Sequence, residues 1–112
     1  MRNISFALTT EQFLDGTKTV TRRLGWLFLK EGDELCAVRK CQGLRAGEKL
    51  DRLGKIRVIG LRRERLSTIT GADVAREGFF GKSAEWFIEF FCGTHVGCER
   101  NTEVTRIEFE RL

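Results

Sequence analysis

The 112-residue sequence contains no proline and no tyrosine, and histidine and methionine occur once each. The absence of proline excludes proline-rich linkers and polyproline segments. No apolar run approaches the about 18–20 residues that a membrane span needs. The first residues, MRNISFALTT, lack an apolar segment long enough for a signal peptide. We therefore expect a soluble, cytoplasmic protein without membrane contact and with no protein partner that the sequence reveals.

Hydrophobic residues make up 41% of the chain and charged residues 32%, which is an ordinary globular mixture. A chain of this length suits one domain, over residues 1–112, with its own core and no need for metal or disulfide support. The net charge is +4, and most arginines and lysines lie between Arg22 and Arg65. Arginine clusters favour phosphate and base partners, but a solvated face interspersed with acids has the same composition. Both interpretations stay open.

The cysteines are Cys36, Cys41, Cys92 and Cys98, and in a reducing cytoplasm they are expected to be free thiols. The run CGTHVGC places His95 midway between Cys92 and Cys98, which raises a subsidiary hypothesis of a zinc site at these three residues. Neither cysteine spacing is that of a CxxC knuckle, however. We therefore predict no metal and no cofactor.

Residue patterns predict an alternation of strands and helices that ends in a strand. β-branched and apolar runs indicate strands, threonine and serine mark helix starts, and glycine marks a helix end. The predicted elements are a strand at 4–8, a helix from Thr9 or Thr10 to Gly16, strands at 17–23 and 34–40, a loop at 42–54, a strand at 55–66 with a bulge at Gly60, helices starting at Thr70 and Ser83, and a strand at 102–112.

In the second half, Asp73 follows Thr70 at the spacing of a capping box. The helix after Ser83 presents a stripe of Ala84, Phe87, Ile88 and Phe91. The last strand alternates, with Ile107 and Phe109 on one face and Arg106 and Glu108 on the other. The connections are too short for repeated βαβ units, so we predict an α+β fold, a mostly antiparallel β-barrel with about three flanking helices.

The run GTKTVTRR is the segment richest in chemistry. A threonine hydroxyl such as Thr21 becomes a nucleophile when a base takes its proton, and a neutral lysine can be that base. Lys18 is close in sequence to Arg22 and Arg23, whose charges would lower its pKa. In a regular strand, however, residues 18 and 21 point to opposite faces, so they meet only if the strand bends or ends between them.

The run GTKTVTRR, the EGDEL turn and strand, and the closing VTRIEFERL strand resemble the ASCH domain, a relative of the PUA fold. That family carries a Gly-x-Lys-x-x-(Glu/Thr)-x-Arg signature, which Gly16, Lys18, Thr21 and Arg23 match. The likeness covers nearly the whole chain in length and element order. With threonine at the sixth position of the signature, the chain resembles the small bacterial members that hydrolyse N4-acetylcytidine.

The resemblance implies that Lys18 activates Thr21, that Thr21 attacks the acyl carbonyl, and that a glutamate donates a proton to the leaving amine. By its place at a helix end within TGADVAREGF, that glutamate is expected to be Glu77. Arg23 would stabilise the oxyanion or orient the ligand. Arg22 would bind a phosphate. The expected activity is that of an amide hydrolase acting on N4-acylated cytidine.

Two alternatives stay open, because the segment CQGLRAGEKLDRLG is longer and more basic than that branch leads us to expect. The domain could bind RNA without chemistry, with Arg45, Lys49 and Arg52 on the RNA backbone. It could also be a ribonuclease that uses the same cleft. The expected partner is thus a modified nucleoside or RNA.

Aromatic residues could stack a base in that cleft. In the helix after Ser83, Trp86 and Phe90 are candidates, while helical spacing predicts that Phe87 and Phe91 are core residues. Trp26, which follows the signature, is the better stacking candidate, and for it both a place in the cleft wall and a place in the core stay open.

Overall fold

The computed structural model describes residues 1–40 and 45–112. The order of its elements is the predicted one. Cys41 and the start of the predicted loop 42–54 lie outside the described residues. The elements are β1 (Asn3–Ser5), α1 (Thr10–Leu14), β2 (Val20–Arg23), β3 (Glu34–Val38), β4 (Arg52–Arg65), a short 3-10 helix η1 (Leu66–Thr68), α2 (Gly71–Arg76), α3 (Ala84–Thr94) and β5 (Glu103–Arg111). None of the helices in the described ranges is long and apolar enough to cross a membrane.

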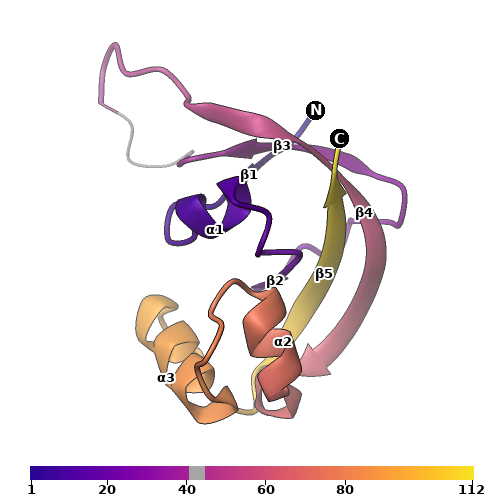
Figure 1. Ribbon diagram of the computed structural model, residues 1–112, viewed down its shortest axis with the longest axis vertical. Helices are drawn as coiled ribbons and strands as arrows, with labels where there is room; N and C mark the ends of the chain where they lie inside the picture. Colours follow the sequence, from indigo (N-terminus) through magenta and orange to yellow (C-terminus); the bar gives the residue numbers. More distant parts are fainter. Residues whose placement is uncertain (41–44) are drawn as a thin grey trace.

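The strands form one five-stranded sheet in the order β1-β3-β4-β5-β2. β1 runs parallel to β3, and the other neighbouring pairs are antiparallel. The α+β class is confirmed, but the predicted barrel is not, because β1 and β2 are the two edges of an open sheet. The sheet is strongly curved (Figure 1). Its edges approach at one point, where the Arg23 NH2 group donates to the Ser5 carbonyl at 2.6 Å.

The long strand β4 carries the predicted bulge, which is confirmed. Its register with β5 shifts between Val58 and Gly60. A Cβ atom added at Gly60 would lie 3.2 Å from Glu108 Oε1, so a residue without a side chain fits best at this bulge.

Two hydrophobic clusters lie along the curved sheet. The first packs α1 against the sheet, and the second joins α2 and α3 to η1, which follows β4, and to the start of β5. The ribbon shows α2 and α3 beside this end of the sheet (Figure 1). The buried members of the first are Ile4, Phe6, Phe13, Leu29, Leu35, Ala37, Ile56, Val58, Ile107 and Phe109, and those of the second are Leu66, Ile69, Val74, Phe87, Ile88, Phe91 and Val104.

Both predicted helix starts in the second half are confirmed. The Thr70 hydroxyl accepts a hydrogen bond from the Asp73 backbone N–H at 3.2 Å, and the Ser83 hydroxyl accepts one from Trp86 N–H at 3.0 Å. Gly16 has φ +83°, as the predicted end of α1 requires.

Four predicted strands are shorter in the structure, and β1, β2 and β3 each lose two or more residues at one end. β1 ends at Ser5, β2 begins only at Val20, and β3 ends at Val38. Before β2, the Lys18 backbone N–H donates to the Gln12 carbonyl at 3.0 Å and the Thr19 N–H donates to the Arg76 carbonyl at 2.8 Å. These bonds tie the segment before β2 to α1 and α2 instead of to a neighbouring strand.

Candidate functional site

A cleft of about 390 Å³ opens between the two core clusters. It is lined by the connection that follows β1, by the signature segment, by the end of α2 and by one side of α3. Five polar or charged residues of the signature segment and the end of α2 line it, and five phenylalanines add an aromatic surface. The polar or charged residues are Lys18, Thr21, Arg22, Arg23 and Glu77, and the aromatic ones are Phe6, Phe79, Phe87, Phe90 and Phe91.

Lys18 and Thr21 line this cleft together, although strand alternation would separate them. The reason is that β2 begins at Val20, so Lys18 precedes the regular strand. Lys18 is 3% exposed, and its Nζ donates to Glu77 Oε1 and to the Glu77 carbonyl, both at 2.9 Å.

The backbone at the end of α2 places Glu77 beside Lys18. It is the C-cap residue of this helix, and Gly78 follows with φ +103°. A Cβ atom added at Gly78 would lie only 2.7 Å from Gln12 Cβ, so glycine alone fits the close approach of α2 to α1.

Burial lowers the pKa of Lys18 below the ordinary value for lysine, because the interior disfavours the charged ammonium. The carboxylate of Glu77 opposes this effect, and the positive charges of Arg23 and Arg22 add to it. The neutral amine needed for a general base is thus reached at a lower pH than in an exposed lysine.

The Thr21 hydroxyl is held by Arg23, which follows two positions later on the same strand. Thr21 is 3% exposed, and its Oγ1 accepts a hydrogen bond from Arg23 Nε at 3.0 Å. The guanidinium of Arg23 also lies 5.3 Å from the centroid of the Phe6 ring. Because Arg23 donates to the threonine oxygen, the hydroxyl proton is left to point toward another acceptor.

Arg22 borders the cleft beside Glu77, but its side chain has no exposed surface. Its NH1 lies 3.0 Å from Glu77 Oε2, and its NH2 contacts Glu64 Oε2 at 3.1 Å and Asp73 Oδ2. The guanidinium is therefore an internal counter-ion for three carboxylates. It has no exposed face for the phosphate that the sequence analysis assigned to it.

Sequence reasoning missed the roles of Asp73 and Arg106. Asp73 binds Arg106 Nε through Oδ2 at 2.7 Å and Arg106 NH2 through Oδ1 at 3.0 Å. The hydrogen bonds from Arg106, opposed by burial and aided by those from Arg22, hold the pKa of Asp73 well below its ordinary value. The strand pattern places Arg106 on the face opposite Ile107 and does not indicate that Arg106 is buried, yet it is only 8% exposed.

The aromatic surface of the cleft comes from α3, Phe6 and Phe79, and Phe79 was not singled out by the sequence pattern. Phe87 and Phe91 are buried as predicted, and Phe90 stacks on Trp86 with ring centroids 5.1 Å apart. Trp26 lies elsewhere. It packs on the first core cluster, 5.4 Å from the ring of Phe28, and is not among the cleft residues.

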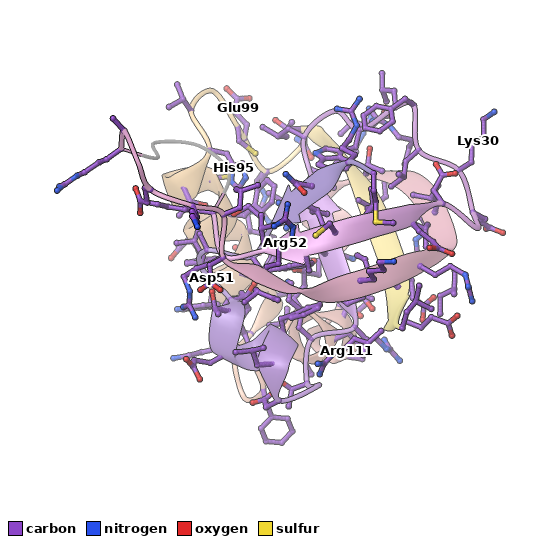
Figure 2. All side chains as sticks on the ribbon, turned by 90° about the horizontal axis from the view of Figure 1, so that it is seen from above. Lys30, Asp51, Arg52, His95, Glu99 and Arg111 are labelled. Carbon is purple, nitrogen blue, oxygen red and sulfur yellow. The ribbon has the colours of Figure 1, made fainter. Side chains whose placement is uncertain are left out.

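The basic residues proposed for RNA contact, Arg45, Lys49 and Arg52, are exposed and lie outside the cleft. Arg52 borders a second hollow of about 420 Å³ together with Cys36 and Lys55. Figure 2 shows Asp51 and Arg52 at the start of β4, and Lys30 far away at the other side of the molecule.

Cys92 and Cys98 approach each other at the end of α3, with their sulfur atoms 3.9 Å apart, and both are free thiols, as is Cys36. His95 Nδ1 lies 2.9 Å from the Phe91 carbonyl oxygen. Within residues 1–40 and 45–112, no group of three or more histidine, cysteine or acidic side chains is placed to hold a metal ion.

No family model and no curated protein matches the chain. Solved structures do match it over nearly its whole length. Protein EF3133 from Enterococcus faecalis V583 has a TM-score of 0.69 and 12% identity, with 100% of this chain and 76% of that chain covered. The hypothetical protein PH0355 has a TM-score of 0.68 and 19% identity, covering 99% and 96%.

An ASCH domain from Lactobacillus crispatus JV V101 is also similar, with a TM-score of 0.67, 18% identity, and 98% of this chain and 78% of that chain covered. The expected family likeness was drawn from the signature and the element order. The structural comparison supports it independently, through the course of the backbone. The chain therefore has the fold of an ASCH-like domain.

Proposed function

We propose that the chain hydrolyses the amide bond of an N4-acylated cytidine, with Thr21 as nucleophile, Lys18 as base and Glu77 as proton donor. The observation that carries this proposal is the buried Lys18–Glu77 pair beside a threonine hydroxyl in one cleft. A buried ion pair is costly to build and adds little stability, so a pair that lines a cleft favours a chemical role.

The proposed reaction needs one proton path. Lys18 accepts the hydroxyl proton of Thr21 as Oγ1 attacks the acyl carbon, and Arg23 stabilises the oxyanion. The proton passes along the 2.9 Å hydrogen bond from Lys18 to Glu77, and Glu77 gives it to the N4 nitrogen, so that cytidine leaves as a neutral amine. Water then attacks the acyl-threonine ester, its proton returns to Thr21 by the reverse path, and the acyl group leaves as a carboxylic acid.

The shape of the cleft suits a nucleoside. A volume of about 390 Å³ lies within the range of small-molecule sites, and phenylalanine rings offer a face on which a pyrimidine can stack. The polar residues beside these rings would then face the acylated amine.

The proposal is tested by chromatographic detection of cytidine released from N4-acetylcytidine. We expect release by the wild type and none by Thr21→Ala or Lys18→Ala, while Thr21→Ala keeps its affinity for the ligand. Thr19→Ala is the matched control, because Thr19 belongs to the same run but is exposed, and it should release cytidine at the wild-type rate.

Absence of release above the control without enzyme would discard this substrate. Release that survives in Thr21→Ala would discard Thr21 as the nucleophile. In the first case RNA binding becomes the leading hypothesis, and cleavage of a single-stranded RNA in the same assay separates a ribonuclease from a binding module.

A further inference from the structure

One carboxylate in the cleft is shared between two cations. Oε1 of Glu77 lies 2.9 Å from Lys18 Nζ, and Oε2 lies 3.0 Å from Arg22 NH1. Lys18 and Glu77 are each 3% exposed, and the side chain of Arg22 has no exposed surface. The three groups therefore interact without the screening that water gives to surface ion pairs.

The array continues on the far side of Arg22. Its NH2 group contacts Asp73, and Asp73 binds Arg106 with both carboxylate oxygens. Asp73 of α2, which is itself bound by Arg106 of β5, therefore holds one side of the Arg22 guanidinium, and Glu77 contacts the other side. Asp73 and Arg106 do not line the cleft, so they reach the candidate site only through Arg22.

The sharing of Glu77 has a direct electrostatic consequence. Besides binding the shared carboxylate, the positive charge of Arg22 repels the Lys18 ammonium, and this repulsion lowers the pKa of Lys18. With Arg22 in place, the ammonium form of Lys18 is less favoured. Without Arg22, Lys18 would interact with Glu77 and would no longer be repelled by the guanidinium. The lysine would then keep its proton to a higher pH.

We propose that Arg22, anchored by Asp73 and Arg106, is a positioning residue that holds Glu77 by Oε2 and sets the pH range in which Lys18 loses its proton. The catalytic meaning of this arrangement rests on the proposed function, but the protonation of Lys18 is measurable without turnover. Arg22 stands at a position that the family signature leaves unspecified, so the signature alone does not identify it.

Other charged or titratable groups surround the pair, and each charged one contributes to the field at Lys18. They come from the strands beside it, from α2 and from the end of α3 across the cleft. Besides Glu77 and Arg22, these groups are Arg23 from β2, Glu64 from β4, Asp73 and Arg76 from α2, His95 after α3 and Arg106 from β5.

The test is a pH titration of the lysine side chains by nuclear magnetic resonance with 13Cε-labelled lysine. The chain has six lysines, Lys18, Lys30, Lys40, Lys49, Lys55 and Lys82, and the Lys18 signal is assigned by its absence in Lys18→Met. We expect Arg22→Gln to raise the Lys18 midpoint by about one pH unit or more. Asp73→Asn is expected to lower the Lys18 midpoint. This substitution removes a negative charge that partly neutralises Arg22, so the positive potential at Lys18 increases.

Opposite shifts from two neighbouring substitutions cannot arise from general loosening of the fold. Arg22→Lys retains the charge and should return the midpoint most of the way to the wild-type value. If Arg22→Gln does not fold, the double variant Arg22→Gln/Asp73→Asn is compared with Asp73→Asn alone. The double variant removes one positive and one negative charge from the buried array, and its midpoint should be the higher of the two.

An unchanged midpoint in Arg22→Gln, or shifts of the same sign in both variants, would overturn the proposal. The outcome separates from that of the proposed function. If the wild type releases no cytidine but the midpoints move as expected, the hydrolase assignment fails and the role of Arg22 stands. If cytidine is released and the midpoints do not move, the reverse holds.

Discussion

Nζ of Lys18 lies 2.9 Å from Oε1 of Glu77, although 59 positions separate the two residues in the sequence. The contact exists because β2 begins only at Val20 and α2 ends in a glycine turn. The segment before β2 and the end of α2 therefore meet between the two core clusters. Isolated from water, each charge depends on the other. This dependence can be measured separately from any activity.

Glu77→Gln removes the anion that Lys18 faces and should lower the free energy of unfolding by about 3 kcal/mol at pH 7, because a buried cation is left uncompensated. Adding Lys18→Met should recover most of this loss, since the two buried charges then disappear together. Urea unfolding curves of the wild type, both single variants and the double variant form the necessary cycle.

A matched control for this cycle is the exposed pair Arg100–Glu85, whose nitrogen and oxygen lie 2.7 Å apart with side chains 52% and 63% exposed. Glu85→Gln should leave stability nearly unchanged, because water screens this pair. A double variant of Lys18 and Glu77 as unstable as Glu77→Gln would show that the buried pair contributes stability in its own right.

Asp73 makes the fold sensitive to acid. Its pKa in the folded chain is lowered by the hydrogen bonds from Arg106, so in the unfolded chain the carboxyl binds a proton at a higher pH, near 3.8. The stability that this group contributes is therefore present above about pH 4 and is lost as the pH falls below it. We expect urea unfolding curves between pH 2 and 7 to show a steep loss in the wild type, and Asp73→Asn to flatten it.

Asp15 provides the comparison for that pH series. Its pKa is also lowered, by hydrogen bonds from Thr17, but the side chain is exposed. Asp15→Asn should leave the steep acid loss in place. If Asp15→Asn flattens the curve as much as Asp73→Asn does, the acid sensitivity does not come from the buried array.

Much of the fold was accessible from local sequence signals. The caps at Thr70 and Ser83, the glycine stop at Gly16 and the bulge at Gly60 each depend on neighbouring residues, and each is confirmed. The open sheet was missed, because closure depends on whether β1 and β2 pair, and their sequences are too short and too polar to reveal their partners.

The residues of the candidate site that belong to the signature were predictable from the sequence. The residues that only tertiary contacts bring to the site were not. Strand alternation placed Arg106 opposite Ile107 but could not show that it is buried, since nothing in the sequence of β5 indicates that Asp73 of α2 binds there. Gly78 was a usable signal for the position of Glu77, because glycine after a helix end often marks a turn. For Arg22, only the carboxylates brought by β4 and α2 reveal that it faces inward.

Phe90 is the most informative aromatic residue of the cleft, because it is half-buried and lines the cleft where Phe87 and Phe91 are core. Phe90→Ala should weaken the binding of cytidine about tenfold in isothermal titration calorimetry, the lower part of the range for loss of one base–aromatic stack. Phe80→Ala is the control, because Phe80 is 90% exposed and lies outside the cleft. Equal effects of the two substitutions would place the base elsewhere.

The exposed basic residues discriminate between a nucleoside hydrolase and an RNA-binding module. Arg45, Lys49 and Arg52 lie outside the cleft, so the triple alanine variant should hydrolyse N4-acetylcytidine at the wild-type rate. An RNA-binding module would lose affinity for a single-stranded RNA in this variant, and the slope of log affinity against log salt would become shallower by about 0.7 for each phosphate contact removed. Fluorescence anisotropy with a labelled oligonucleotide at 50 to 200 mM salt measures that slope.

A shallower slope together with unchanged hydrolysis would mean that the basic surface holds an RNA whose modified base enters the cleft. An unchanged slope would leave the free nucleoside as the substrate, since no other predicted RNA contact lies outside the cleft except Trp26, which packs on the core.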